Sequence, residues 1–334
     1  MVIVQSYAVA VAMCVVTMMC WGSWANTQKL ATKKWPFQLY YWDYCLGVVI
    51  LSLIMAFTLG SMGSTGRGFV ADISQVSQRA LMMAFLGGVV FNLANILLVA
   101  AIDIAGMSVA FPIGIGIALV EGVIINYAAD KQGNPVILFA GVAAIMAAIV
   151  IDAIAYRKLP SQGTKTTGKG IVISVVAGVL MGLFFRLVQE AMPKDFAVSE
   201  AGKVGPYAAV VIFSVGLFLS SFIWNTLVMR KPFVGEPVKY SDYAKLGDMR
   251  LHIIGILGGM IWGVGMSFAN IASGAAGDAI SYGLGQGATL VAAIWGVFIW
   301  KEFKGAPKGT NKLLGLMFAC FFVGLALIIL AKNV

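Results

Sequence analysis

Long apolar runs separated by short polar segments dominate the hydrophobic pattern of this chain. A bilayer core about 30 Å thick needs roughly 20 apolar residues per helix. Ten runs of that kind occur, and they predict membrane-spanning helices over Ser6–Trp24, Phe37–Leu59, Ala80–Ala101, Met107–Tyr127, Pro135–Tyr156, Gly170–Met192, Pro206–Val228, Leu251–Ala272, Asp278–Trp300 and Lys312–Leu330. The period-two alternation of a transmembrane barrel is absent. The first run has no basic leader or small-residue cleavage site, so we interpret it as an uncleaved helix.

The composition supports an all-α polytopic membrane protein. Of 334 residues, 60% are hydrophobic and 11% are charged, which is too few charges to cover a soluble surface of this size. A disordered chain, a disulfide scaffold and an ordinary soluble enzyme are therefore excluded. The four cysteines lie in apolar runs without metal-ligand spacing, so we expect packing residues and neither a metal nor a cofactor.

The basic residues gather in loops on one side of the predicted helices. Sixteen of the 23 lysines and arginines follow odd-numbered helices, six lie on the other side, and Arg186 falls inside a helix. By the positive-inside rule the basic side is cytoplasmic and both termini are outside. The net charge of +9 therefore flanks a lipid bilayer, which we expect to be a bacterial inner membrane, and does not predict a nucleic-acid partner.

The two halves of the chain resemble each other at an offset of 171 residues. Phe85–Gly88 aligns with Ile256–Gly259, Gly106 with Gly277, and Phe111–Gly116 with Tyr282–Gly287. We interpret this as a duplicated five-helix unit, 1–156 and 170–334, joined by a polar cytoplasmic linker at 157–169; chance similarity of glycine-rich segments is the alternative. Because five is odd, the second copy enters the membrane from the opposite side. Inverted repeats predict a transporter with a midplane site and alternating access.

Polar side chains inside the apolar runs are the candidate binding residues. Asn92 and Asn95 are three residues apart on one helix, and Gln286 lies at a similar depth in the ninth. Their amides suit a small neutral polar solute, although interhelical hydrogen bonding is the alternative. Trp21 and Trp262 could present apolar faces to a sugar or stack on a heterocycle.

Ionisable side chains inside the membrane mark function by default. Glu121 and Arg186 lie at matching depths and are expected to pair, either as a coupling switch or as a static ion pair. Asp43 is expected to bind substrate, carry a proton or pair with Lys29. Three acids near helix ends are expected to be hydrated: Asp152, Glu190 and Asp278.

Enzyme motifs are not found. His252 is the one histidine, and the sequence contains no HExxH, nucleophile elbow or Walker motif. Transport driven by a proton or sodium gradient is therefore expected, with an exporter or a passive facilitator as alternatives.

Two stretches of sequence resemble families of the drug/metabolite transporter superfamily. Gly283–Gly287 leading to Trp295–Gly305 is similar to the glucose/ribose and rhamnose sugar porters. Asp43–Tyr44 and the run to Gly60 resemble plant-type ureide permeases, and so do four further matches: Ser74–Gln75, Gly87–Val90, Asn95 and Gly106–Val109.

The resemblances agree on mechanism and differ in cargo. The sugar porters imply monosaccharide uptake with protons or sodium, and the ureide permeases imply allantoin-like ureides or nucleobases carried with protons. The loop charges favour a bacterial sugar importer of ribose, glucose or rhamnose. A ureide or nucleobase importer and a drug or metabolite exporter are the alternatives.

Overall fold

The computed structural model describes residues 1–31, 35–159 and 168–332, and the regular structure within them is entirely helical. Ten helical segments are long and apolar enough to cross a membrane: Tyr7–Ala31, Phe37–Phe57, Gln78–Ala105, Phe111–Ala129, Pro135–Arg157, Gly168–Glu190, Pro206–Arg230, Met249–Ala276, Asp278–Ile299 and Thr310–Leu330. This confirms the predicted all-α polytopic class. Most of the predicted linker 157–169 lies outside the described residues.

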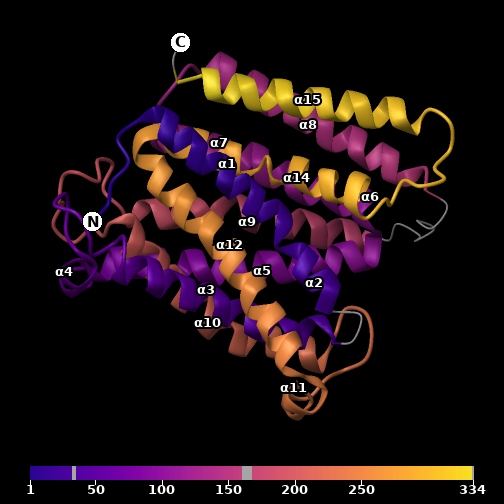
Figure 1. Ribbon diagram of the computed structural model, residues 1–334, viewed down its shortest axis with the longest axis horizontal. Coiled ribbons are helices and arrows are strands. Elements are labelled where there is room, and N and C mark those ends of the chain that lie inside the picture. Colours follow the sequence, from indigo (N-terminus) through magenta and orange to yellow (C-terminus); the bar gives the residue numbers. More distant parts are fainter. Residues whose placement is uncertain (32–34, 160–167, 333–334) are drawn as a thin grey trace.

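Four helices form the centre of the bundle. They are α3 (Phe37–Phe57), α5 (Gln78–Ala105), α10 (Pro206–Arg230) and α12 (Met249–Ala276). Helix α3 packs on α10 and α12, and α5 packs on α10. Helix α1 (Tyr7–Ser23) lies along α12, and α9 (Gly168–Glu190) along α5. Figure 1 shows α8 (Pro135–Arg157) and α15 (Thr310–Leu330) paired along one edge of the molecule.

Glycines bring the central helices into backbone contact. A Cβ added at Gly88 of α5 would lie 2.0 Å from the Phe213 carbonyl oxygen of α10. A Cβ added at Gly259 of α12 would lie 1.9 Å from the Tyr44 carbonyl oxygen of α3. Since real Cβ atoms do not approach this closely, both crossings require glycine.

A second pair of glycines makes the reciprocal contacts. Gly47 of α3 faces the Ile256 carbonyl oxygen of α12, which would lie 2.1 Å from an added Cβ. Gly216 of α10 faces the Phe85 carbonyl oxygen of α5, at 2.2 Å. Phe85 and Ile256 are separated by the same 171 positions as Gly88 and Gly259.

The ends of α5 and α12 also correspond. Both helices have 28 residues, and their bounds differ by 171 positions. Each ends at a glycine with positive φ, 77° at Gly106 and 90° at Gly277, a conformation that glycine adopts without the steric cost of a side chain. These correspondences agree with the predicted duplication, which remains a proposal.

Three predicted spans are continued or interrupted where single helices were expected. The first continues past Trp24 as α2 (Ala25–Ala31). The fourth is built from α6 (Met107–Ala110), the π-helix η1 (Phe111–Ile115) and α7 (Gly116–Ala129), and Pro112 supplies no N–H in η1. The ninth consists of α13 (Asp278–Gly285), α14 (Ala288–Ile294) and η2 (Trp295–Ile299), with its break at Gln286–Gly287.

The two faces of the bundle differ in what they carry. The Met1 ammonium donates to the Thr65 carbonyl, and the Asn134 N–H donates to the Ala331 carbonyl, so both chain ends join one face, the termini end. The short helix α4 (Phe69–Ser74) lies there. The opposite face, the basic end, carries α11 (Tyr240–Leu246) and the lysine-rich loops. Which end faces the cytoplasm remains a prediction.

Candidate functional site

A cavity of about 440 Å³ lies between two of the central helices, α5 and α12, and the helices next to them. Its walls come from α1, α2, α5, η1, α9, α12 and the break between α13 and α14. Small-molecule sites in proteins enclose about 300–1,000 Å³. The cavity therefore has the size of a binding site for one small solute, and both halves of the chain contribute to it.

One wall of the cavity is aromatic. The Trp21 and Trp262 rings stack with centroids 5.9 Å apart and planes inclined by 13°. Phe91 lies 4.3 Å from Trp262 and 5.0 Å from Phe184, measured between ring centroids. A planar solute held between two rings needs about 7 Å, twice the distance of optimal carbon contact. A solute must therefore stack against this wall, because it does not fit between the two indoles.

Three carboxamides line the same cavity: Gln28 on α2, Asn95 on α5 and Gln286 at the break before α14. The Asn95 amide nitrogen donates to the Tyr41 hydroxyl at 3.2 Å, while no donor in the described part of the chain reaches the Asn95 Oδ1. The Gln286 side chain also makes no hydrogen bond to described residues. The Asn95 oxygen and the Gln286 amide are therefore available to a solute in the cavity.

Asn92 serves packing and does not line the cavity. Its amide nitrogen donates to Ser220 Oγ at 2.7 Å and to the Leu217 carbonyl at 3.1 Å. Its oxygen accepts from the Tyr41 hydroxyl at 3.0 Å, and the side chain is fully buried. The alternative of interhelical hydrogen bonding is thus the arrangement observed for Asn92. The two asparagines share Tyr41, but only Asn95 reaches the cavity.

Asp43 lies near the basic end and away from the cavity. It is 1% exposed, lies 2.8 Å from His252 Nδ1 and accepts from the Tyr243 hydroxyl. Burial and the neighbouring Asp43 carboxylate raise the pKa of Tyr243, which lies on α11 outside the spans. The alternative partner Lys29 instead binds Glu302. Asp43 therefore fastens α11 and the start of α12 to α3.

Glu121 and Arg186 do not form the expected pair. Arg186 makes ion pairs with Glu190 and, at 3.3 Å, with Asp278. Glu121 lies beside Gly182, one turn earlier on α9, and forms no ion pair with a described residue. Matching depth was insufficient because Arg186 points toward the termini end, where two acids were available. The expectation that Asp278 is merely hydrated is wrong for the same reason.

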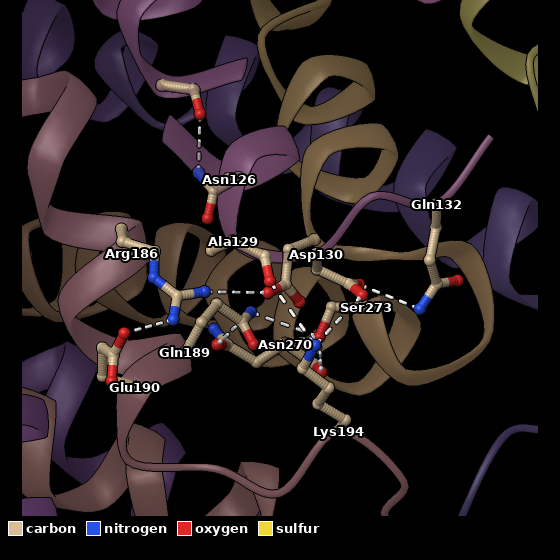
Figure 2. Close-up of polar contacts among 12 residues, drawn as sticks. Asn126, Ala129, Asp130, Gln132, Arg186, Gln189, Glu190, Lys194, Asn270 and Ser273 are labelled. Carbon is tan, nitrogen blue, oxygen red and sulfur yellow. Dashed lines mark hydrogen bonds and ion pairs between the residues drawn. The ribbon is translucent and has the colours of Figure 1, made fainter. Parts of the chain in front are cut away.

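A separate hollow of about 320 Å³ surrounds Arg186 at the termini end (Figure 2). Lys194 approaches Asp130 at 4.0 Å, and Gln189 donates to the Ser273 hydroxyl at 3.2 Å. These contacts join α7, α9, α12 and the loop after α9 across the hollow. The predicted coupling residue Arg186 therefore belongs to a polar network distinct from the aromatic cavity.

The basic end of the cavity is lined by charged residues that sequence reasoning missed. Lys29 on α2 and Asp103 on α5 both line it. Lys29 is assigned to a loop if the first helix ends at Trp24, and Asp103 lies just beyond a third helix that ends at Ala101. The structure extends both helices, which turns two apparent loop charges into residues of the cavity mouth.

The sequence is similar to known transporters over nearly its whole length. A family model described as ureide permease matches residues 40–165 and 157–331. Ureide permeases 1 and 2 of Arabidopsis thaliana are 25% and 26% identical, over 100% of this chain and 99% of each relative. Glucose uptake protein GlcU of Bacillus subtilis (strain 168) is 23% identical, over 84% of this chain and 86% of that protein.

A solved structure titled "Crystal structure of protein" has a TM-score of 0.59 and 14% identity, covering 98% of this chain and 99% of that one, and shows a shared fold alone. The family match covers nine of the ten candidate spans in the described residues almost completely, and it includes the cavity walls from α5, η1, α9, α12 and α14 but not those from α1 and α2. The protein is a multi-pass membrane transporter, and the chain belongs to the ureide permease family.

Proposed function

We propose that this transporter imports a small, neutral, planar solute with amide or urea groups, of the ureide or nucleobase type. The observation that carries the proposal is the pair of carboxamides, Asn95 and Gln286, beside an aromatic wall. A carboxamide offers a donor and an acceptor in one plane, which complements the adjacent N–H and C=O of a urea or cyclic amide. The Trp21 and Trp262 rings supply the flat face on which such a solute stacks.

Alternating access to a site built by two inverted halves is the proposed mechanism. The corresponding glycine crossings and the interrupted fourth and ninth spans support a duplicated unit, 1–156 and 170–334. Charged residues of the mouth, Lys29 and Asp103, lie at the basic end, whereas the Arg186 network joins the helices at the termini end. With the basic end in the cytoplasm, the described conformation is open to the inside. We further propose that protons drive uptake.

A monosaccharide is the second candidate. The relative GlcU is a glucose uptake protein by name, and sequence analysis favours a sugar. A sugar presents hydroxyls in several directions and would need polar partners around its rim. Apart from the charged mouth, the polar side chains of the cavity are the amides of Gln28, Asn95 and Gln286 and the hydroxyl of Thr289, which donates to the Gln286 backbone carbonyl. A lining in which amides predominate favours the planar solute.

Uptake into proteoliposomes tests this order. We expect labelled allantoin or uracil to enter, and each to be displaced by the other in preference to ribose, glucose or rhamnose. Asn95→Leu replaces the amide by an apolar side chain of similar size. It should weaken the apparent affinity about tenfold, since a lost buried hydrogen bond costs about 1–3 kcal/mol. Uptake of the three sugars with no uptake of allantoin or uracil would overturn the ureide assignment.

A further inference from the structure

Two acids, Asp152 and Glu302, do not line the cavity, but Glu302 binds Lys29, which does. Asp152 of α8 is 8% exposed, and its Oδ1 has no hydrogen-bond partner in the described part of the chain. Tyr156, four residues later on the same helix, contacts Glu302, which brings this second acid near Asp152. This corrects the expectation that Asp152 is hydrated at a helix end. An ionised carboxylate buried without a donor or a cation is unfavourable, and binding a cation removes that cost.

Tyr156 is a neighbour of both acids. It lies one turn after Asp152 on the same face of α8, and its hydroxyl donates to Glu302 Oε2 at 2.6 Å. The other oxygen, Glu302 Oε1, accepts from the Lys29 ammonium at 2.6 Å. Glu302 therefore lies between a buried, unpartnered carboxylate and a lysine that lines the cavity.

The backbone is shaped to hold Glu302 there. The π-helix η2 ends just before it, and Lys301 has φ of 52°, the one positive φ among described residues other than glycine. A Cβ added at Gly296 would lie 2.9 Å from the Tyr156 hydroxyl oxygen and 3.0 Å from Glu302 Oε2. π-Helical turns and strained residues of this kind concentrate at functional sites.

The same segment fastens the wall of the cavity mouth. The Trp295 indole N–H donates to Ser23 Oγ at 2.9 Å, and the Trp300 indole N–H donates to Asn26 Oδ1 at 2.6 Å. With Lys29, which also lies 4.3 Å from the Trp300 ring centroid, these contacts fall three residues apart along α1 and α2. Helix α2 is thus latched to the segment that carries Glu302.

Of the charged and titratable groups near the two acids, Lys29 of α2 and Tyr156 of α8 contact Glu302. Arg157 and Lys158 follow Tyr156, Lys301 and Lys304 flank Glu302, and α7 carries Glu121 and Tyr127, and none of these pairs with either acid among the described contacts. Helices α6, η1, α14 and η2 contain no titratable residue. Along α15, the neighbour of α8, the titratable residues are Lys312 and Cys320, and neither pairs with Asp152 among the described contacts. Since Lys29 and Tyr156 already occupy both Glu302 oxygens, the site has room for a proton and lacks the ligand shell that a sodium ion needs.

We propose that Asp152 and Glu302, joined by Tyr156, form the proton-binding site that couples transport, and that protonation releases Lys29 from Glu302 and unlatches α2. In uptake the proton is taken from water outside the cell while the site is open to the outside, and it is released to cytoplasmic water at the cavity mouth in the described conformation, while Lys29 keeps its own proton. This inference rests on the proposed function. It replaces Glu121 and Arg186 as the coupling residues.

Transport assays separate coupling from solute binding. In proteoliposomes with the membrane potential clamped, a one-unit pH gradient should drive about tenfold accumulation of labelled allantoin for one proton per solute. Glu302→Gln and Asp152→Asn should abolish this accumulation while leaving allantoin counterflow intact, because exchange needs no net proton movement. Glu236→Gln, which alters an exposed acid at the same end, is the matched control and should behave as wild type.

Accumulation by both variants at the wild-type level would overturn the inference, as would accumulation driven by a sodium gradient at equal pH. Absence of allantoin or uracil counterflow in the wild type would instead overturn the proposed function.

The site itself is then decided by infrared difference spectra of the purified protein between acid and alkaline buffer. We expect a protonated-carboxyl band that Asp152→Asn or Glu302→Gln removes and Glu236→Gln retains. Identical spectra for all variants would refute the proton site.

Discussion

The Tyr41 hydroxyl fixes the orientation of the Asn95 amide. The Leu217 carbonyl accepts from the Asn92 amide nitrogen, so the Asn92 oxygen faces Tyr41, and Tyr41 donates its one hydrogen there. The hydroxyl can then only accept from Asn95, whose nitrogen lies 3.2 Å away. The Asn95 oxygen is left facing the cavity, so the solute must bring it an N–H or O–H donor.

Replacing Tyr41 tests this relay of hydrogen bonds. Tyr41→Phe frees the Asn95 amide to turn, so allantoin affinity should fall about fivefold, the equivalent of one hydrogen bond of about 1 kcal/mol. Competition curves should also show weaker discrimination against analogues that lack the matching N–H. Equal affinity and equal discrimination in Tyr41→Phe would show that the relay does not set the amide. Asn92→Leu provides a comparison, because it should lower the unfolding temperature in detergent.

The aromatic wall predicts a graded response at Trp21. Stacking of a base on an aromatic side chain contributes about 1–3 kcal/mol by alanine substitution, so Trp21→Ala should weaken uracil binding about tenfold or more. Trp21→Phe keeps a flat face and should lose much less. Trp42→Phe is the control, because that ring packs on Phe222 and Tyr240 outside the cavity. Equilibrium binding to purified protein measures all three, and equal losses for Trp21→Phe and Trp21→Ala would argue against stacking.

The Arg186 network predicts how the termini end is kept closed. Asp278→Asn removes one of the two acids that hold Arg186, so the hollow should open more often. The labelling rate of Ser273→Cys by a membrane-impermeant maleimide should then rise about fivefold, for an ion pair of about 1 kcal/mol. Glu200→Gln changes another acid of the same hollow that forms no ion pair among described residues. A rate insensitive to Asp278→Asn, after subtraction of labelling at the native cysteines, would exclude a closing role.

The glycine crossings predict that alanine substitution lowers stability at two of these glycines, while a glycine outside the crossings tolerates alanine. Gly88→Ala and Gly259→Ala each press a methyl group into a backbone carbonyl, so each should cost about 1–3 kcal/mol of stability. Gly315→Ala on α15 meets no neighbouring atom and gains helix propensity, so it should be neutral or stabilising by less than about 1 kcal/mol. Thermal unfolding in detergent compares the three. A tolerated alanine at Gly88 or Gly259 would contradict the observed backbone contact.

Sequence patterns predicted the class and the number of spans because hydropathy over 20 residues is a strong signal. Helix continuations were missed since they depend on tertiary contacts. The first helix passes Trp24 because Asn26 and Lys29 bind Trp300 and Glu302 on a distant segment. No local pattern contains those partners.

The sequence predicted only part of the candidate site, because it indicates the depth of a residue in the membrane but not its tertiary partners. Asn95, Gln286, Trp21 and Trp262 share one cavity, as residues of unusual polarity or size at mid-depth often do. Depth alone does not give the direction of a side chain around its helix axis. Asn92 has the depth expected for a cavity residue, yet its side chain faces α10. Arg186 has the same depth as Glu121, yet its side chain faces the termini end.

The four glycine crossings bear on how the protein changes shape. Gly47 and Gly259 join α3 to α12, and Gly88 and Gly216 join α5 to α10, so each crossing is a contact between the two halves of the chain. Because the backbones touch directly, no side chains lie between these helices that could rearrange and let them slide. A rocking movement of the two halves as rigid bodies would break these backbone contacts. We therefore expect the helices outside the four crossings to move. Distances measured by spectroscopy between labels on α2 and α14 should change during transport, while distances between labels on α3, α5, α10 and α12 should stay constant.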